Sequence, residues 1–239
     1  MAVFSGETLL CIRGERTVFA DLDFRLESGG ALVLVGPNGS GKSSLLRVMA
    51  GLLRAADGAL SWDGEPVADD PEGHAGRLHY VGHLDAVKPV MSVFENLVFW
   101  ARLRGGTAGA EDRVAQALAT LGIGHLLDVP GRYLSAGQKR RVNLARVLAA
   151  PAPLWLLDEP TTALDRDAIQ AIEATIAHHR QGGGMVVIST HADMDLPAAD
   201  VLDLARFTRR PRSVFQGQED EDMDDEDPDD ADMPAREAG

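Results

Sequence analysis

The chain has 239 residues, a formal net charge of −14 at pH 7 and a single cysteine, Cys11, so an internal disulfide is excluded. The segment 217–239 holds 12 acidic residues and one arginine, a charge of −11, which leaves −3 (−14 minus −11) for the rest of the chain. Such a balance argues against a nucleic-acid-binding protein that relies on a broad basic face. A chain of this length buries a full hydrophobic core without help from disulfides or metals.

We expect neither a signal peptide nor a membrane span. Residues 1–7 lack a basic start followed by a long apolar run. The apolar stretch 144–157 is interrupted by Arg146, Pro151 and Pro153 and is shorter than the ~20 residues that a bilayer requires. The chain is therefore expected to be soluble and cytoplasmic, with any membrane role exercised through a partner.

Strand and helix patterns alternate along the chain. Apolar runs and turn residues predict two short strands in 8–25, strands at 31–35, 78–81, 154–157 and 185–190, a hairpin around 59–64, and helices at 42–53, 92–127 and 168–179. This order predicts an α/β fold with a mostly parallel sheet, an N-terminal antiparallel β subdomain and an inserted α-helical subdomain at about 92–150. Residues 1–206 would form one domain. Residues 207–239 would form an acidic tail too poor in apolar side chains to fold.

A glycine-rich segment lies between the strand predicted at 31–35 and the helix that follows it. It matches the pattern GxxxxGK[ST], in which glycines let successive N–H groups face phosphates and the helix N-terminus favours an anion. Lys42 would reach the β- and γ-phosphates, and the Ser43 hydroxyl would bind Mg²⁺. A chance glycine-rich turn is the alternative. The predicted phosphate-binding residues are Gly36, Pro37, Asn38, Gly39, Ser40, Gly41, Lys42, Ser43 and Ser44.

Two carboxylates, Asp158 and Glu159, follow the apolar strand predicted at 154–157. Asp158 would hold Mg²⁺ through water, and Glu159 would position the attacking water as general base. Two surface carboxylates at a strand end are common on their own. The phosphate-binding segment upstream favours the catalytic interpretation.

The run Leu134-Ser135-Ala136-Gly137-Gln138 precedes a basic helical segment and ends sixteen residues before Leu154. A helix that opens at Ser135 and Gly137 can point its N-terminus at a γ-phosphate, which makes a second anion site. With this run the sequence resembles the ABC ATPases, whose signature motif has the same form. The resemblance covers roughly residues 3–204.

Membership of that family implies that residues 1–206 form an ABC nucleotide-binding domain with a P-loop NTPase core. This domain would bind ATP with Mg²⁺ and hydrolyse it. It also implies a head-to-tail homodimer, because the signature residues Ser135, Gly137 and Gln138 would serve the ATP held by the opposite subunit. Asp165 matches the D-loop, which crosses the dimer interface. His191 matches the switch histidine, which contacts the γ-phosphate and positions the water together with Glu159. A lone histidine after a strand is more often structural, but the order of motifs favours the catalytic role.

Two positions depart from the family pattern. Where relatives carry a glutamine that touches Mg²⁺ and senses the membrane partner, this chain has His83, either as a tolerated change or as a subfamily mark. Where many relatives stack an aromatic ring on adenine, the matching position falls near Arg13, whose guanidinium plane can also stack. Phe19 is the alternative.

Residues 80–105 and 134–165 resemble the ATP-binding subunit of the haem exporter of cytochrome c maturation. That resemblance implies an energy-coupling ATPase on the cytoplasmic face of the bacterial inner membrane. Its partners would be integral membrane permease subunits, the cytochrome c maturation membrane proteins, and it would bind no nucleic acid. One alternative is the ATPase of another exporter, for drugs or lipids. Another is a soluble ABC ATPase, a class that typically has two cassettes in one chain or a long coiled coil.

Overall fold

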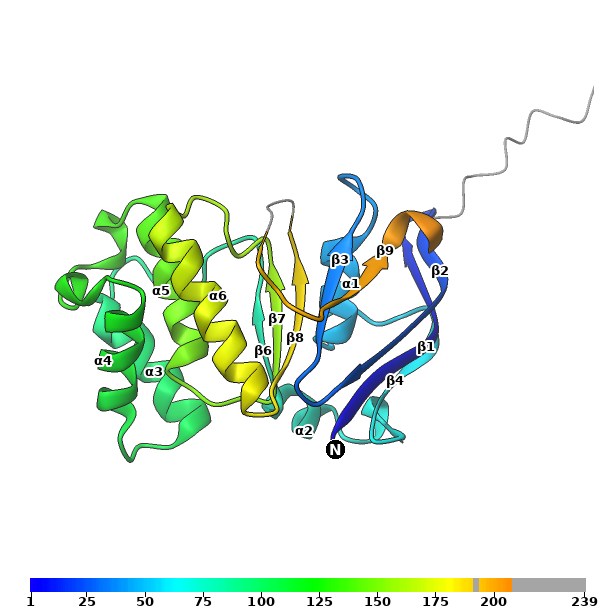
Figure 1. Ribbon diagram of the computed structural model, residues 1–239, viewed down its shortest axis with the longest axis horizontal. Helices are drawn as coiled ribbons and strands as arrows, with labels where there is room; N and C mark the ends of the chain where they lie inside the picture. The colour runs from blue at the N-terminus through cyan, green and yellow to red at the C-terminus, as the bar shows by residue number, and fades with distance from the viewer. Residues whose placement is uncertain (191–193, 208–239) are drawn as a thin grey trace, which may run out of the picture. The chain divides into compact units, whose positions relative to one another are not determined.

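The computed structural model describes residues 1–190 and 194–207, which build two sheets and the helices around them (Figure 1). One sheet is antiparallel and four-stranded, in the order β2-β1-β4-β5; the other is five-stranded, in the order β6-β7-β8-β3-β9, with parallel pairs. The strands are β1 (Val3–Arg13), β2 (Arg16–Glu27), β3 (Ala31–Val35), β4 (Asp57–Trp62), β5 (Glu65–Pro66), β6 (Leu78–Val81), β7 (Leu154–Asp158), β8 (Met185–Ser189) and β9 (Asp200–Asp203). The α-helices are α1 (Lys42–Met49), α2 (Pro71–Gly76), α3 (Val93–Gly105), α4 (Ala110–Thr120), α5 (Ala136–Leu148) and α6 (Arg166–Gln181).

The parallel sheet is buried on both faces, which explains the continuous apolar runs in its sequence. Every residue of β7 and β8 is buried. Because side chains alternate across a strand, Leu154 and Leu156 join the core around α1, whereas Trp155 and Leu157 join the core formed with α3, α4 and α5. The carboxyl ends of β3, β6, β7 and β8 meet at one edge of this sheet, where α/β proteins bind ligands.

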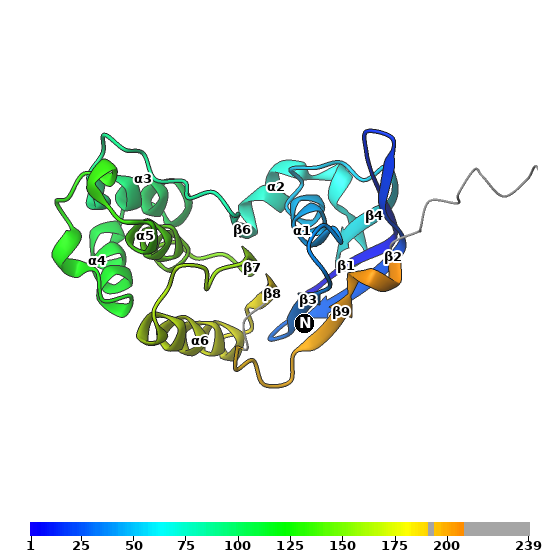
Figure 2. The same cartoon turned by 90° about the horizontal axis from the view of Figure 1, so that it is seen from above.

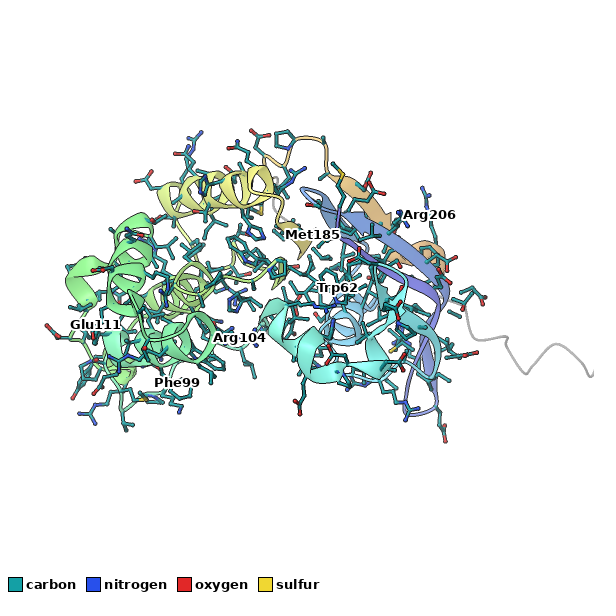
Figure 3. All side chains as sticks on the ribbon, turned by 90° about the horizontal axis from the view of Figure 1, so that it is seen from below. Trp62, Phe99, Arg104, Glu111, Met185 and Arg206 are labelled. Carbon is teal, nitrogen blue, oxygen red and sulfur yellow. The ribbon has the colours of Figure 1, made fainter. Side chains whose placement is uncertain are left out.

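The helices α3, α4 and α5 gather on one side of the parallel sheet, and the antiparallel sheet lies on the other (Figures 1 and 2). Arginines join these helices to the sheet: Arg104 donates to the Leu78 carbonyl at 2.5 Å, and Arg146 donates to the Tyr80 carbonyl at 2.7 Å. Figure 3 shows Arg104 at this junction. Burial lowers the pKa of His79 to about 4, so its ring is neutral at pH 7, and its Nε2 lies 2.9 Å from the Ala150 carbonyl oxygen. These contacts tie β6 to α3, to α5 and to the residues that follow α5.

The α/β fold with a parallel sheet, antiparallel β strands and added helices is confirmed, but several boundaries differ from those predicted. Helix α1 ends at Met49 rather than near Leu53, because Gly51 turns into the left-handed region (φ 70°) and the Leu52 N–H folds back to the Arg47 carbonyl. Strands β1 and β2 are longer than the short strands expected, and α2 and β9 were not predicted. Within residues 1–190 and 194–207, no helix combines the length and the apolar character of a membrane span.

Candidate functional site

A cavity of about 550 Å³ opens at the carboxyl edge of the parallel sheet. Its walls come from the β1–β2 hairpin, the loop between β3 and α1, the residues after β6 and the residues after β7. The lining consists of Arg13, Arg16, Val18, Asn38, Gly39, Gly41, Lys42, Ser43, Ser44, His83, Glu159 and Thr162. Most of the predicted phosphate-binding loop thus shares one cavity with Glu159, Arg13 and His83.

The phosphate-binding loop, residues 36–43, depends on glycine for its backbone. Gly36, Gly39 and Gly41 have φ values of 136°, 79° and 106°, a region that side chains disfavour. A Cβ on Gly41 would lie only 2.6 Å from Val18 Cγ1, so this position also needs glycine for space. Lys42 is 8% exposed as a residue, and its Nζ donates to the Gly36 carbonyl at 2.7 Å. An ammonium group is therefore held at the wall of the cavity, beside the N-terminus of α1.

Asp158 carries a carboxylate that is almost fully buried, with 1% of the residue exposed. Its Oδ1 accepts hydrogen bonds from the Ser189 hydroxyl at 2.6 Å and the Ser43 hydroxyl at 3.1 Å. Its Oδ2 is buried and has no hydrogen-bond partner among the described residues. Among the described residues, the donors to this carboxylate are hydroxyls, and burying a charge without a counter-ion is costly. Hydroxyl and carboxylate oxygens suit Mg²⁺. The donor set of Ser43 and Asp158 therefore fits this ion.

Glu159 has a strained backbone, with φ at 50° in the left-handed region. For a residue other than glycine this conformation costs roughly 1–2 kcal/mol, so the surroundings must hold it. Its N–H lies 3.0 Å from the Ser189 carbonyl oxygen and 3.2 Å from the Ser189 hydroxyl, and its carbonyl accepts from Arg140 at 2.6 Å. The strain occurs where the side chain lines the cavity, as is common at functional sites.

The predicted signature residues form the start of α5. Ser135 is the N-cap, and it exchanges two hydrogen bonds with Gln138: the Ser135 hydroxyl accepts from the Gln138 N–H at 3.3 Å, and the Gln138 side chain accepts from the Ser135 N–H at 2.8 Å. Gly137 packs so closely on the loop between β7 and α6 that an added Cβ would lie 2.6 Å from the Ala163 carbonyl oxygen. In the described part of the chain, none of these three residues lines the cavity.

Asp165 is the N-cap of α6 and accepts from the Ala168 N–H at 3.0 Å. This hydrogen bond, followed by the nearby Arg141 guanidinium, lowers the pKa of the Asp165 carboxyl. Arg141 lies on α5 and forms an ion pair with Asp165, so the predicted D-loop is held against the signature helix. Asp165 also lies outside the lining formed by the described residues.

The structure separates the two candidates for adenine stacking. Arg13 is exposed and lines the cavity, whereas Phe19 is 0% exposed and belongs to the core. Stacking by Arg13 stays a prediction, and His191 lies outside the described residues.

Sequence reasoning missed Ser189 and Arg140, which bind the backbone or carboxylate of the strand end at Asp158. A signal existed for each. Ser189 ends β8 in register with Asp158, and Arg140 shares the buried face of α5 with Leu144 and Val147.

The family model for ABC transporters matches residues 19–162. The chain belongs to the ABC transporter family. It is therefore an ABC-type ATPase, and it binds ATP.

Two similar proteins carry the name cytochrome c biogenesis ATP-binding export protein CcmA. The protein from Rhodospirillum rubrum is 62% identical over 210 residues, which covers 88% of this ATPase and 89% of the relative. The protein from Paramagnetospirillum magneticum is 61% identical over 207 residues, which covers 86% of this ATPase and 95% of the relative. A solved structure of an ATP-binding subunit of an ABC transporter superimposes with a TM-score of 0.73 at 26% identity, covering 79% of each chain.

The contact between Gly137 and Ala163 leads to the first prediction. In Gly137→Ala the new Cβ forces the helix start or the loop at Ala163 to move, so we expect ATP hydrolysis to fall by about tenfold or more. Gly124→Ala is the matched control, because nothing lies within 4 Å of a Cβ there and we expect the wild-type rate. Phosphate release and melting temperature measured on both variants check this. A wild-type rate in Gly137→Ala would mean that this contact has no bearing on hydrolysis.

Proposed function

We propose that this ATPase binds Mg-ATP in the cavity and hydrolyses it with Glu159 as general base and His191 as the second group that orients the water. One observation carries the proposal: the cavity brings together the ammonium group of Lys42, the strained residue Glu159 and the hydroxyl of Ser43, which donates to the buried Asp158 carboxylate.

In this mechanism the loop N–H groups around Gly39 and Gly41 donate to phosphate oxygens, and Lys42 turns its ammonium from the loop carbonyls to the β- and γ-phosphates. Ser43 and Asp158 would hold Mg²⁺, which when bound offsets negative charge on the phosphates. The Glu159 carboxylate accepts a proton from the attacking water as the new O–P bond forms. The bond from the γ-phosphorus to the β-phosphate oxygen breaks, and ADP leaves with that electron pair.

The positions of Arg13 and His83 in the cavity lining support a proposed role for each. Arg13 is proposed to stack its guanidinium plane on adenine, a role supported by its exposure at the cavity and by the burial of Phe19. His83 is also exposed at the cavity and lies two residues past the end of β6. It is proposed to lie near the phosphates and Mg²⁺ and to sense the membrane partner.

The active species is proposed to be a head-to-tail homodimer with ATP held between the two copies. The proposal is supported by the cavity lining formed by the described residues, which does not include Ser135, Gly137, Gln138 or Asp165. These four residues would serve the nucleotide of a second copy. Because the Ser135 hydroxyl already caps Gln138, the first-turn N–H groups around Gly137 remain the natural donors to a γ-phosphate.

We further propose that the chain is the energy-coupling subunit of the haem exporter of cytochrome c biogenesis. The names of relatives at 62% and 61% identity support this role. Its partners would be the integral membrane subunits of that system, and it would act at the cytoplasmic face of the bacterial inner membrane without binding nucleic acid. Exposed apolar side chains on α3 and on the segments that precede α3 and α5 are candidates for contact with such partners: Leu84, Val90, Phe99, Leu103 and Tyr133. Residues 1–206 are the proposed catalytic domain, with a helical subdomain at about 92–150; the tail from residue 207 is proposed to be an appendage.

The assigned roles of Lys42 and Glu159 make opposite predictions for binding and turnover. Lys42→Ala removes a cation from the β- and γ-phosphates, so nucleotide affinity should fall. Glu159→Gln preserves shape but removes the base, so affinity should persist while hydrolysis falls by about 100-fold or more. Glu72→Gln, an exposed glutamate on α2, is the matched control with an expected wild-type rate. Nucleotide titration and phosphate release distinguish these effects, and wild-type turnover by Glu159→Gln would remove its assignment as base.

The composite dimer can be tested by mixing two inactive variants. Lys42→Ala lacks a working phosphate loop, and Ser135→Arg lacks a working signature, so each alone should be inactive. A mixed dimer contains one intact site, and random pairing in a 1:1 mixture should restore about a quarter of the wild-type rate. The readout is ATP hydrolysis before and after mixing. No recovery in a mixture shown to contain mixed dimers would contradict the shared site.

A further inference from the structure

Arg140 is a buried cation on the helix that begins at the signature motif. It lies five residues past Ser135 on α5, with 4% of its surface exposed. Its side chain does not belong to the cavity lining formed by the described residues, so it does not act through direct contact with a nucleotide there.

The guanidinium joins the ends of two parallel strands. One nitrogen, Nη2, donates to the carbonyls of Asp158 at 2.5 Å and Glu159 at 2.6 Å. The other, Nη1, donates to the Gly82 carbonyl at 2.8 Å and lies 3.5 Å from an Asp85 carboxylate oxygen. Arg140 therefore fixes the turn that carries Glu159 and the segment 82–85 that carries His83, both of which line the cavity.

The contact with Glu159 is significant because the backbone there is strained. Ser189 holds the N–H side of this residue and Arg140 holds the carbonyl side, so the direction of the carboxylate depends on both. A buried arginine that faces mainly carbonyls is a costly way to gain stability. Its Nε has no hydrogen-bond partner among the described residues, which adds to that cost.

We propose that Arg140 is a positioning residue for ATP hydrolysis. Its guanidinium holds the Glu159 carboxylate in its working direction, in register with His83, and connects both to the helix that begins at Ser135. The inference rests on the proposed role of Glu159 as base. The rate of hydrolysis then depends on the position of α5. A shift of that helix would move the Arg140 guanidinium and, with it, the backbone and carboxylate of Glu159.

The first test compares two arginines on the same helix in the full chain, Arg140, which is buried, and Arg146, which is half-buried. Arg140→Met should lower kcat by about tenfold or more while the KM for ATP changes less than about twofold, because the lost contacts orient a group that acts in the transition state. Arg140→Lys should fall between, since a single ammonium cannot reach all four acceptors. Arg146→Met is the control: Arg146 donates to the Tyr80 carbonyl and should leave kcat unchanged.

The second test asks whether Arg140 acts through Glu159. If it does, adding Arg140→Met to Glu159→Gln should not reduce the residual rate further, because the base has already gone. If Arg140→Met instead lowers activity through general damage to the fold, the fold-losses in rate of the two single variants should multiply in the double variant. Nucleotide affinity and melting temperature are recorded for every variant, and if Arg140→Met does not fold, Arg140→Lys is used in both tests.

The outcomes separate this inference from the proposed function. Wild-type turnover by Glu159→Gln would remove the proposed role of Glu159 as base, on which the inference rests. If Glu159→Gln is inactive as expected, the inference on Arg140 is overturned by any of three results: unchanged kcat in Arg140→Met, an equal loss in Arg146→Met, or multiplying effects in the double variant. If Arg140→Met does not fold, unchanged kcat in Arg140→Lys overturns it equally.

Discussion

The site depends on one buried charge, the carboxylate of Asp158 at the end of β7. Strand β7 lies between β6 and β8 and is covered on both faces, so the side chain at its end is removed from water. The carboxylate is held by hydroxyls from two neighbouring elements, Ser43 at the start of α1 and Ser189 at the end of β8. A charge in such surroundings is costly without a counter-ion. This cost explains why the phosphate loop, the acid and β8 must meet at one point, and why Mg²⁺ belongs to our account of the site.

The geometry beyond this charge follows from how β7 ends. The chain turns sharply at Glu159, whose N–H remains tied to Ser189 while its carbonyl turns toward α5 and Arg140. Ser135 is the N-cap of α5, and Arg140 lies five residues further along the same helix. Arg140 therefore connects the start of this helix to the end of β7, next to the proposed base. In the proposed mechanism, these hydrogen bonds would link nucleotide chemistry at the parallel sheet to movement of α5. Such a link is what an ATPase needs if a membrane partner is to control its rate.

The architecture and much of the candidate site could be predicted because they rest on local patterns. Buried strands appear as short apolar runs, and the glycines of the phosphate loop have a spacing dictated by backbone geometry. Features without a local pattern were missed. Strand β9 is a short edge strand with polar ends, and α2 is a six-residue helix that contains proline and glycine. In the sequence, Ser189 is only a polar end to an apolar run and Arg140 only a charge on an apolar helix face. Their partners lie 31 and 18 residues away and are fixed by strand register and helix packing, so their roles could not be assigned.

The most direct test of the account is the Mg²⁺ dependence of thermal stability with ATP present, compared between the wild type and Asp158→Asn. Binding to the folded state raises the melting temperature, so the wild type should melt higher with Mg-ATP than with ATP and a chelator. Asp158→Asn removes the buried charge and an ion ligand while preserving shape, so its melting temperature without ligand should not fall much and its Mg²⁺-dependent increment should disappear. An increment in Asp158→Asn equal to that of the wild type would contradict the central role of this carboxylate.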